Sequence, residues 1–382
     1  MPKPPFPRRG HPNSKSVELP AELTPWTKET QRFCDKFKLG LDRPAADTPN
    51  GWFQARFPKL TDAYGAAVLE AYPAGQKEEG QLPFVQDLGE DFLAATLGEA
   101  GRPEAPTVFL PTEGRFYSYR PDLGIYVEAR EAKLTAELSH VLLTCGRDCA
   151  AKCNTTNLQF KFRDTGNLRG VVQRARGLLE VPAGYFERDL QTLIACRNGM
   201  LRLADRELLA FGPGYRRRNK LAVAYVAGAE CPMFLEVLMH AALEREDLDL
   251  LQRWCGLALI GVTLAQRMVI LSGTAGGGKG TFIRVLHGII GAENIGSLRP
   301  ALLGERFEMG GFLGKSLLYG ADVTEDFLNC KSAGYLKGLL GVDPVTFELK
   351  GSNERPTIIS RFNAIVTCNS RLTVRLEGDT EA

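Results

Sequence analysis

Residues 273–281 read G-T-A-G-G-G-K-G-T and follow the apolar run M-V-I-L of residues 268–271. A helix-compatible stretch, residues 282–290, comes directly after them. A buried strand that leads into G-x-x-x-x-G-K at the start of a helix is the pattern of a phosphate-binding loop. Glycines let successive backbone N–H groups face phosphate oxygens, and the helix N-terminus adds partial positive charge. We therefore predict an ATP-binding loop here and prefer this interpretation to a purely structural glycine turn.

The positions within this loop have separate predicted roles. Lys279 is expected to reach the β- and γ-phosphates of the nucleotide. A Ser or Thr hydroxyl normally follows this lysine and binds Mg²⁺, but here the next residue is Gly280. Thr281 or a water molecule must then take that role. The residues expected to contact ATP are Gly273, Thr274, Ala275, Gly276, Gly277, Gly278, Lys279, Gly280 and Thr281.

Composition indicates an ordinary globular protein. The chain has 382 residues, enough for two or three domains of about 150 residues each. Hydrophobic residues make up 44% and charged residues 24% of the chain. Its first residues lack the apolar core of a signal peptide, and no run reaches the roughly 18 apolar residues of a membrane span. We therefore expect a cytoplasmic protein whose nine cysteines are free thiols.

Charge and proline are distributed unevenly along the chain. Counting Lys and Arg against Asp and Glu gives +5 over residues 1–60 and −7 over residues 61–110. Ten of the 22 prolines also lie in residues 1–60. We predict a proline-rich basic segment (1–60), an acidic connecting region (61–110), a mostly helical domain (111–265) and an α/β core (266–382).

The last part of the chain alternates between strand and helix patterns. After the glycine-rich loop and its helix come a strand at residues 316–321, a helix at 333–340, a hairpin-like stretch at 345–359 and a strand at 363–367. Such alternation is typical of an α/β domain built on a parallel sheet.

Polar side chains follow two of these predicted strands. The run L-L-Y-G-A-D ends at Asp322, with Glu325 and Asp326 close behind, and the last strand ends near Asn369. Carboxylates at the carboxyl ends of parallel strands face the ligand crevice. We predict that Asp322 organises Mg²⁺, with Glu325 as the runner-up or the base, and that Asn369 contacts the γ-phosphate or the attacking water. The alternative interpretations are helix-capping acids and a turn asparagine.

From about Phe116 onward, the chain resembles the phage and plasmid primase-helicase family, which is related to poxvirus-type primase-helicases. These are superfamily 3 helicases, whose AAA+-type P-loop ATPase core forms hexamers on DNA. The resemblance implies such a core, preceded by a mostly helical domain and an irregular N-terminal segment. The motifs that carry it, besides the loop, are N-G-M-L-R-L (198–203), R-N-K-L-A-V-A-Y (218–225), C-P-M-F-L (231–235), G-K-S-L-L-Y-G-A-D (314–322), L-K-G-L-L-G-V-D-P-V-T-F-E-L-K (336–350) and N-A-I-V-T-C-N-S-R-L (363–372).

Family roles transfer onto individual positions of this sequence. By resemblance, Lys279 is the Walker A lysine, Asp322 the Walker B acid and Asn369 the sensor 1 amide. The hairpin at 345–359 would lie in the hexamer channel, where Lys350, and Lys337 before it, would contact DNA phosphates. A solvated turn lysine is the alternative for Lys350.

The resemblance implies an ATP-dependent DNA helicase or translocase in the replication of a phage, virus or mobile element. Its cofactors would be ATP and Mg²⁺. Its partners would be single-stranded DNA and further copies of itself in a hexameric ring, with a separate primase as a further candidate. The location would be the cytoplasm of a bacterial host or of a virus-infected cell. The family's tryptophan and paired arginines, one of them a trans-acting finger, would lie beyond Ala382. We therefore expect slow hydrolysis unless Arg371 or Arg375 supplies that arginine.

Two other functions stay open on the sequence alone. One is a nucleotide-binding assembly protein without efficient turnover. The other is a small-molecule kinase, suggested by the G-K-G-T run. Such kinases carry this loop near the start of their fold, whereas here it begins only at Gly273, so this function is disfavoured.

The sequence contains two further clusters of chemically reactive or charged residues. Cys145, Cys149 and Cys153 are spaced four apart with His140 upstream, but this is no standard metal-binding pattern, so we favour free thiols. The basic run of residues 216–218, Arg216, Arg217 and Arg218, with Lys220, could touch DNA or a neighbouring subunit. We favour a solvated loop.

Overall fold

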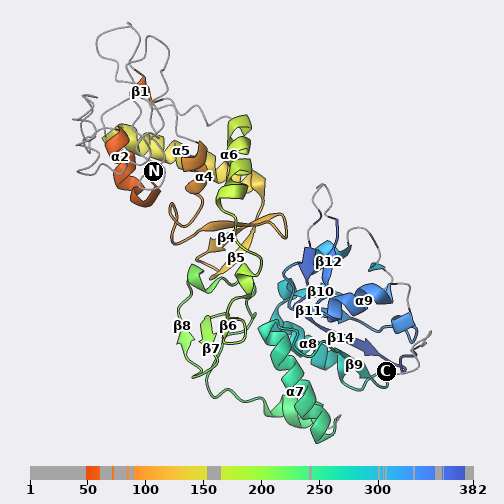
Figure 1. Ribbon diagram of the computed structural model, residues 1–382. Helices are drawn as coiled ribbons and strands as arrows, with labels where there is room; N and C mark the ends of the chain where they lie inside the picture. Colours follow the sequence, from red (N-terminus) through yellow and green to blue (C-terminus); the bar gives the residue numbers. More distant parts are fainter. Residues whose placement is uncertain are drawn as a thin grey trace, which may run out of the picture. The chain divides into compact units, whose positions relative to one another are not determined.

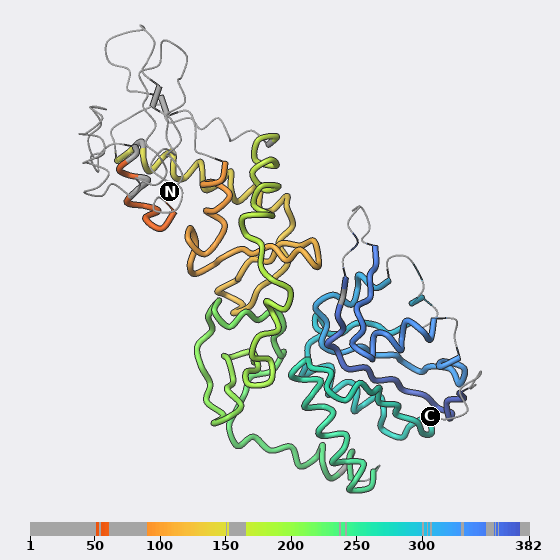
Figure 2. Tube along the Cα trace, viewed as in Figure 1, coloured from red at the N-terminus to blue at the C-terminus, as the bar shows by residue number. Residues whose placement is uncertain are grey.

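The computed structural model describes residues 49–60, 71–72, 84–85, 90–152, 165–240, 243–299, 302–303, 305, 308–329, 332–348, 355 and 357–374. The chain divides into two compact units, shown as a ribbon in Figure 1 and as a chain trace in Figure 2. The first unit draws on Met1–Leu110, Arg115–Tyr119 and Val127–Val181, and the second on Pro111–Gly114, Arg120–Tyr126 and Pro182–Ala382.

Helices form the core of the first unit. Leu134, Leu138 and Leu142 are spaced four apart on α5, so they share one face of that helix and are fully buried. They belong to the same apolar cluster as Leu168 and Val172 of α6. The helices are α2 (Pro49–Arg56), α4 (Glu90–Ala95), α5 (Glu131–Lys152) and α6 (Thr165–Leu178). The helical sequence pattern of residues 131–143 predicts part of α5, which continues beyond it to Lys152.

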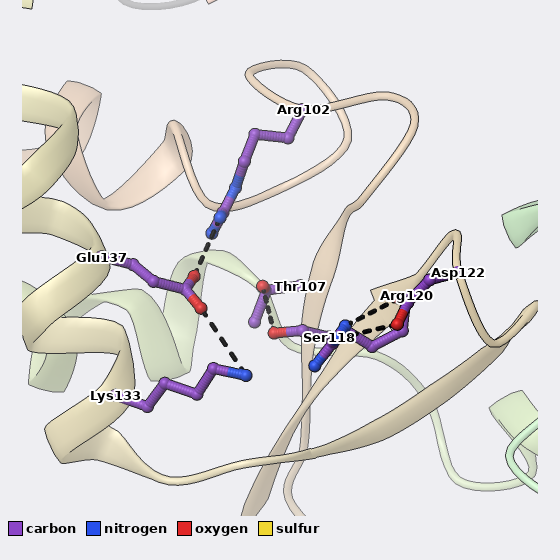
Figure 3. A network of polar contacts seen from close by, with 7 residues as sticks. All are labelled: Arg102, Thr107, Ser118, Arg120, Asp122, Lys133 and Glu137. Atoms are coloured by element: carbon purple, nitrogen blue, oxygen red, sulfur yellow. Dashed lines mark hydrogen bonds and ion pairs between the residues drawn. The ribbon is translucent and has the colours of Figure 1, made fainter. Parts of the chain in front are cut away.

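Short antiparallel strands accompany these helices. They are β1 (Ala71–Tyr72) paired with β2 (Phe84–Val85), and the sheet β3 (Thr107–Leu110), β4 (Arg115–Arg120) and β5 (Ile125–Ala129). Glu137 of α5 accepts a 2.9 Å hydrogen bond from Arg102 and lies 3.9 Å from Lys133 (Figure 3). The hydroxyls of Thr107 and Ser118 lie 2.7 Å apart across β3 and β4 (Figure 3).

The second unit begins with strands and turns rather than helices. Its elements up to residue 260 are η4 (Tyr185–Glu187), β6 (Leu193–Cys196), β7 (Gly199–Arg202), β8 (Leu208–Leu209), η5 (Pro213–Tyr215), the π-helix η6 (Phe234–Met239) and α7 (Arg245–Ile260). β6 and β7 form an antiparallel hairpin around Asn198. The region 111–265, predicted as mostly helical, thus contains short strands as well as helices. The prediction gave these strands too little weight because their sequence patterns are weaker than those of the helices.

A parallel sheet forms the centre of the second unit, as the sequence predicted. The strands are β9 (Met268–Ser272), β10 (Ile295–Ser297), β11 (Leu317–Gly320) and β14 (Asn363–Cys368), in the order β10-β11-β14-β9. All three pairings between them are parallel. The last strand in sequence, β14, therefore lies between the strand before the glycine-rich loop and the strand before Asp322.

Both faces of this sheet are covered. Leu317 and Ile365 belong to a cluster with α7 and α8, whereas their sequence neighbours Leu318 and Ala364 belong to a cluster that includes residues of α9. Successive strand residues face opposite sides, so the two clusters cover opposite faces. The remaining elements are α8 (Lys279–Ile290), η7 (Ala292–Asn294), η9 (Glu308–Phe312), η10 (Phe327–Asn329), α9 (Ala333–Leu340), β12 (Pro344–Thr346) and β13 (Thr357–Ile359).

In the part of the chain that the structure describes, no helix combines the length and apolar character that crossing a bilayer requires.

Candidate functional site

The glycine-rich loop connects the end of β9 to the start of α8. Gly276 and Gly278 have φ angles of 82° and 81°, in the left-handed region that favours glycine. Gly278 caps α8, and its carbonyl accepts hydrogen bonds from the N–H groups of Thr281 and Phe282, both at 3.0 Å. A Cβ at Gly278 would lie 2.7 Å from Leu238 of the π-helix. The positive φ angle therefore favours glycine here, and a larger residue would also displace the end of the Leu238 side chain.

Lys279 occupies the first turn of α8. Its ammonium group donates hydrogen bonds to the carbonyl oxygens of Gly273 at 2.7 Å and Thr274 at 2.9 Å. A third bond, at 3.2 Å, goes to the side-chain oxygen of Asn369. These contacts use all three donors of the ammonium. The structure thus brings together the lysine and the amide that the sequence analysis had selected separately.

Strand pairing explains why Asn369 lies beside the loop. Cys368 of β14 pairs with Ser272 of β9, so both strands end at the same level. The carbonyl of Cys368 accepts the N–H of Gly273 at 3.3 Å, and the Ser272 hydroxyl donates to the carbonyl of Ser370 at 3.3 Å. The first residue of the loop and the end of β14 are therefore joined directly.

Asp322 follows β11 on the other side of β14. Its φ angle is 42°, an uncommon left-handed conformation for a non-glycine residue. Its backbone N–H donates to the hydroxyl of Thr367 at 3.0 Å, and the N–H of Val323 donates to the Thr367 carbonyl at 2.8 Å. Thr367 is buried in β14, two residues before Asn369. The sequence analysis did not select Thr367, because a Thr within the strand run N-A-I-V-T-C is ordinary.

The other predicted acids and the predicted hydroxyl are placed differently. Glu325 and Asp326 are exposed, and the backbone carbonyl of Glu325 accepts the N–H of Thr373 at 2.9 Å. The hydroxyl of Thr281 accepts a 3.0 Å hydrogen bond from Arg284, one turn further along α8. Asp322 makes no direct hydrogen bond or ion pair with Thr281 or Lys279, all three being described residues, so their roles toward a metal stay predictions.

The side chains of Asp322 and Thr281 have the chemistry of magnesium ligands. Asp322 and Thr281 offer a carboxylate and a hydroxyl, the hard ligands that Mg²⁺ prefers. Among the described residues, no group of three or more His, Cys, Asp or Glu side chains could hold a metal ion. Mg²⁺ is usually bound through one or two carboxylates together with substrate phosphates and water. A carboxylate and a hydroxyl are side chains suited to an ion bound in that way.

The predicted DNA-contacting hairpin is present in its described part. β12 and β13 pair antiparallel, with Val345 opposite Ile358, and β12 lies beside α9. Lys337 is exposed on α9. Lys350 lies outside the described residues, as does Arg375, and Arg371 is exposed just after Asn369.

The basic run of residues 216–218 is wrongly predicted as a solvated loop. Arg217 is only 4% exposed, and its guanidinium donates to the carbonyls of Asp189 at 2.8 Å and Leu193 at 3.3 Å. Burial lowers the pKa of Arg217. Arg218 contacts Glu113 at 2.6 Å and Glu187 at 3.4 Å, all three being largely buried. These arginines hold parts of the second unit together, because each binds oxygens of residues that are distant from it in the sequence.

The cysteine cluster is resolved for two of its members. Cys145 and Cys149 are buried free thiols on α5, as predicted, and His140 on the same helix is exposed. Burial raises the pKa of Cys145 to about 11. Cys153 lies outside the described residues.

Comparison with protein families gives two adjoining matches. Residues 117–241 match a model described as "D5 N terminal like". Residues 271–382, which include the glycine-rich loop, Asp322 and Asn369, match a family of unknown function (DUF5906). Among curated proteins, none matches this sequence.

Solved structures similar to this chain include two of the NrS-1 C-terminal region. Its apo structure has a TM-score of 0.45 and 14% sequence identity, and the match covers 79% of this chain and 60% of that chain. The A form apo structure has a TM-score of 0.42 and 14% identity, with coverage of 70% of this chain and 54% of that chain. This chain therefore spans less than two thirds of the length of either.

Proposed function

We propose that this chain is an ATP-hydrolysing DNA helicase or translocase of the phage and plasmid primase-helicase type, with an AAA+-type P-loop core. The observation that carries the proposal is the 3.2 Å contact between Lys279 at the start of α8 and Asn369 at the end of β14. A lysine on a glycine-capped helix and a polar amide at the next strand end are two of the parts that phosphoryl transfer requires. The strand after β14 in the sheet supplies the third, Asp322.

Each of these residues has a proposed task toward ATP. The first N–H groups of α8 lack partners within the helix and can donate to phosphate oxygens, which the helix dipole also attracts. Lys279 would exchange its carbonyl partners for the β- and γ-phosphates, which are stronger acceptors because they are charged. Asn369 would then be placed to orient the attacking water. Asp322, with the hydroxyl of Thr281, would hold the Mg²⁺ that neutralises charge on the phosphates.

DNA binding is proposed for the hairpin side of the same unit. The pairing of β12 with β13 supports a hairpin at the predicted position, and Lys337 supplies an exposed cation on the adjacent α9. Contacts of this kind bind the phosphate backbone without regard to sequence. A ring of subunits, which we propose to be a hexamer, would place one hairpin per subunit around a single strand of DNA.

The match of residues 117–241 to the "D5 N terminal like" model supports the family part of this proposal. It falls on the region whose sequence motifs resemble primase-helicases. Action in replication, together with a separate primase, follows from that resemblance and is proposed on the same basis.

Steady-state ATP hydrolysis, measured with and without single-stranded DNA, tests this function. We expect Mg²⁺-dependent turnover, which DNA stimulates strongly only if Arg371 or Arg375 supplies the trans-acting arginine. The Lys279→Ala variant is the matched negative control. Nucleotide binding without turnover would favour an assembly protein, and phosphate transfer to a small molecule would favour a kinase. Either result would overturn the helicase proposal.

A further inference from the structure

Asp322 adopts a backbone conformation that needs support from its surroundings. A left-handed conformation is unfavourable for a non-glycine residue, although Asp tolerates it better than most. Asp322 is exposed, so packing of its side chain does not hold it in place. The support comes instead from β14, through the two hydrogen bonds that Thr367 accepts from the N–H groups of Asp322 and Val323.

These two hydrogen bonds differ in what they require of the sequence. The bond to the Thr367 carbonyl could form with any residue at that position. The bond to the Thr367 hydroxyl, at 3.0 Å, needs a Ser or Thr side chain. Thr367 is 3% exposed, so water cannot easily replace a missing acceptor there. The Tyr319 hydroxyl of β11 lies 3.3 Å from the same oxygen and gives the Thr367 hydroxyl a second partner.

The position of Thr367 links the two halves of the candidate site. Thr367 and Asn369 are two residues apart at the end of one strand. Asn369 contacts Lys279 on the β9 side, and Thr367 contacts the backbone of Asp322 on the β11 side. A single strand end therefore fixes the amide beside the lysine and the main chain of the acid.

We propose that Thr367 is a positioning residue that acts through Asp322. Its hydroxyl holds the left-handed backbone from which the Asp322 carboxylate reaches the Mg²⁺ of a bound nucleotide. This inference rests on the nucleotide-binding function proposed above.

Two substitutions at one position separate the hydroxyl from the rest of the side chain. Thr367→Val is nearly isosteric and removes the acceptor, whereas Thr367→Ser keeps it. The readout is the affinity for a fluorescent ATP analogue, measured in EDTA and across a Mg²⁺ titration. Loss of an outer-sphere partner typically costs about 10–100-fold in metal affinity or activity. In Thr367→Val, the Mg²⁺ concentration that gives half of the Mg²⁺-induced gain in affinity for the analogue should rise about tenfold. The affinity in EDTA should stay within about twofold of wild type.

Thr367→Ser should stay within about threefold of wild type in the same titration. Tyr319→Phe, which removes a neighbouring hydroxyl but leaves the bond to Asp322, should behave like wild type and controls for the loss of any buried hydroxyl. A wild-type Mg²⁺ titration for Thr367→Val would overturn the proposal. So would an equal loss of affinity with and without Mg²⁺, because that would indicate a merely structural role.

A second measurement does not depend on whether Thr367→Val folds. Amide hydrogen exchange of the wild-type protein should show protection at Asp322 as well as at Val323, and exchange of the Asp322 amide at the rate of an open loop would overturn the proposed contact. Failure of the nucleotide-binding function would look different, since wild type and Lys279→Ala would then bind the analogue equally weakly.

Discussion

The ammonium group of Lys279 lies 3.2 Å from the side-chain oxygen of Asn369, although 90 positions separate the two residues in the sequence. Parallel pairing of β9 with β14 brings them together, because both strands end at the same edge of the sheet. The loop is therefore not an isolated glycine turn. It is one side of a polar site that a neighbouring strand completes.

Replacing Lys279 by Ala should weaken ATP binding and leave the fold intact. The change removes charge-assisted hydrogen bonds worth about 1.5–3 kcal/mol, or roughly 10–100-fold in affinity. Isothermal titration with ATP measures the loss, and the melting temperature checks the fold. Lys337→Ala, on an exposed face of α9, is the matched control and should bind ATP normally. Unchanged affinity in Lys279→Ala would show that the loop assignment is wrong.

Replacing Asp322 by Asn should preserve ATP binding and remove Mg²⁺-dependent hydrolysis. A carboxylate that organises the metal contributes several kcal/mol in the transition state, so turnover should fall about 100-fold or more. Glu325→Gln should be milder, since the structure fixes Glu325 through its main chain. Single-turnover rates for both variants decide the point. A larger loss in Glu325→Gln would reverse the two roles.

Lys337 offers a separate test of the DNA contact. Lys337→Ala should weaken binding of single-stranded DNA across all sequences and reduce the salt dependence of that binding by about one unit of slope. Fluorescence anisotropy with a labelled oligonucleotide, measured over a range of salt concentrations, gives both quantities. Lys279→Ala, assayed without nucleotide, serves as the reciprocal control and should bind DNA like wild type. An unchanged slope in Lys337→Ala would remove this lysine from the DNA surface.

The buried ion pair of Arg218 with Glu113 should matter for stability rather than for DNA binding. Removing one partner of a buried ion pair typically costs about 3–5 kcal/mol. Arg218→Ala should therefore unfold at markedly lower urea concentration. Arg188→Ala is the control, because the Arg188–Asp189 pair is exposed and such pairs contribute about 0–1 kcal/mol. Equal stability of the two variants, combined with weaker DNA binding by Arg218→Ala, would favour the rejected surface role.

Thiol labelling should follow burial among the cysteines of the described residues. Burial raises the pKa of Cys145 and of Cys255 to about 11, so few thiolates exist at either position at pH 8. Cys231 is exposed and should react first with iodoacetamide. Peptide mass spectrometry over a time course gives the order, and early labelling of Cys145 would contradict the buried position.

The strands and helices around the loop could be predicted because each apolar run ends at a glycine or a polar residue. The helix at 333–340 and the strand ending near Asn369 were located in this way. The placement of Arg217 could not, because its acceptors are backbone carbonyls of residues 189 and 193, which no side-chain pattern reveals. Thr367 was missed for a related reason. Thr is common in strands, so Thr367 does not stand out. The partner of its hydroxyl is the main chain of Asp322, whose conformation the sequence does not reveal.

The strand order also bears on how the protein is made. Among the described strands, β9 pairs with β14 alone, yet residues 273–362 lie between them in the sequence. During synthesis the glycine-rich loop leaves the ribosome long before the strand that holds its lysine. Non-local pairing of this kind is slow, and an apolar strand is prone to aggregation until its partner strand has been synthesised. A nascent chain arrested before residue 363 should therefore depend on chaperones and bind no nucleotide, and both properties should change when β14 emerges.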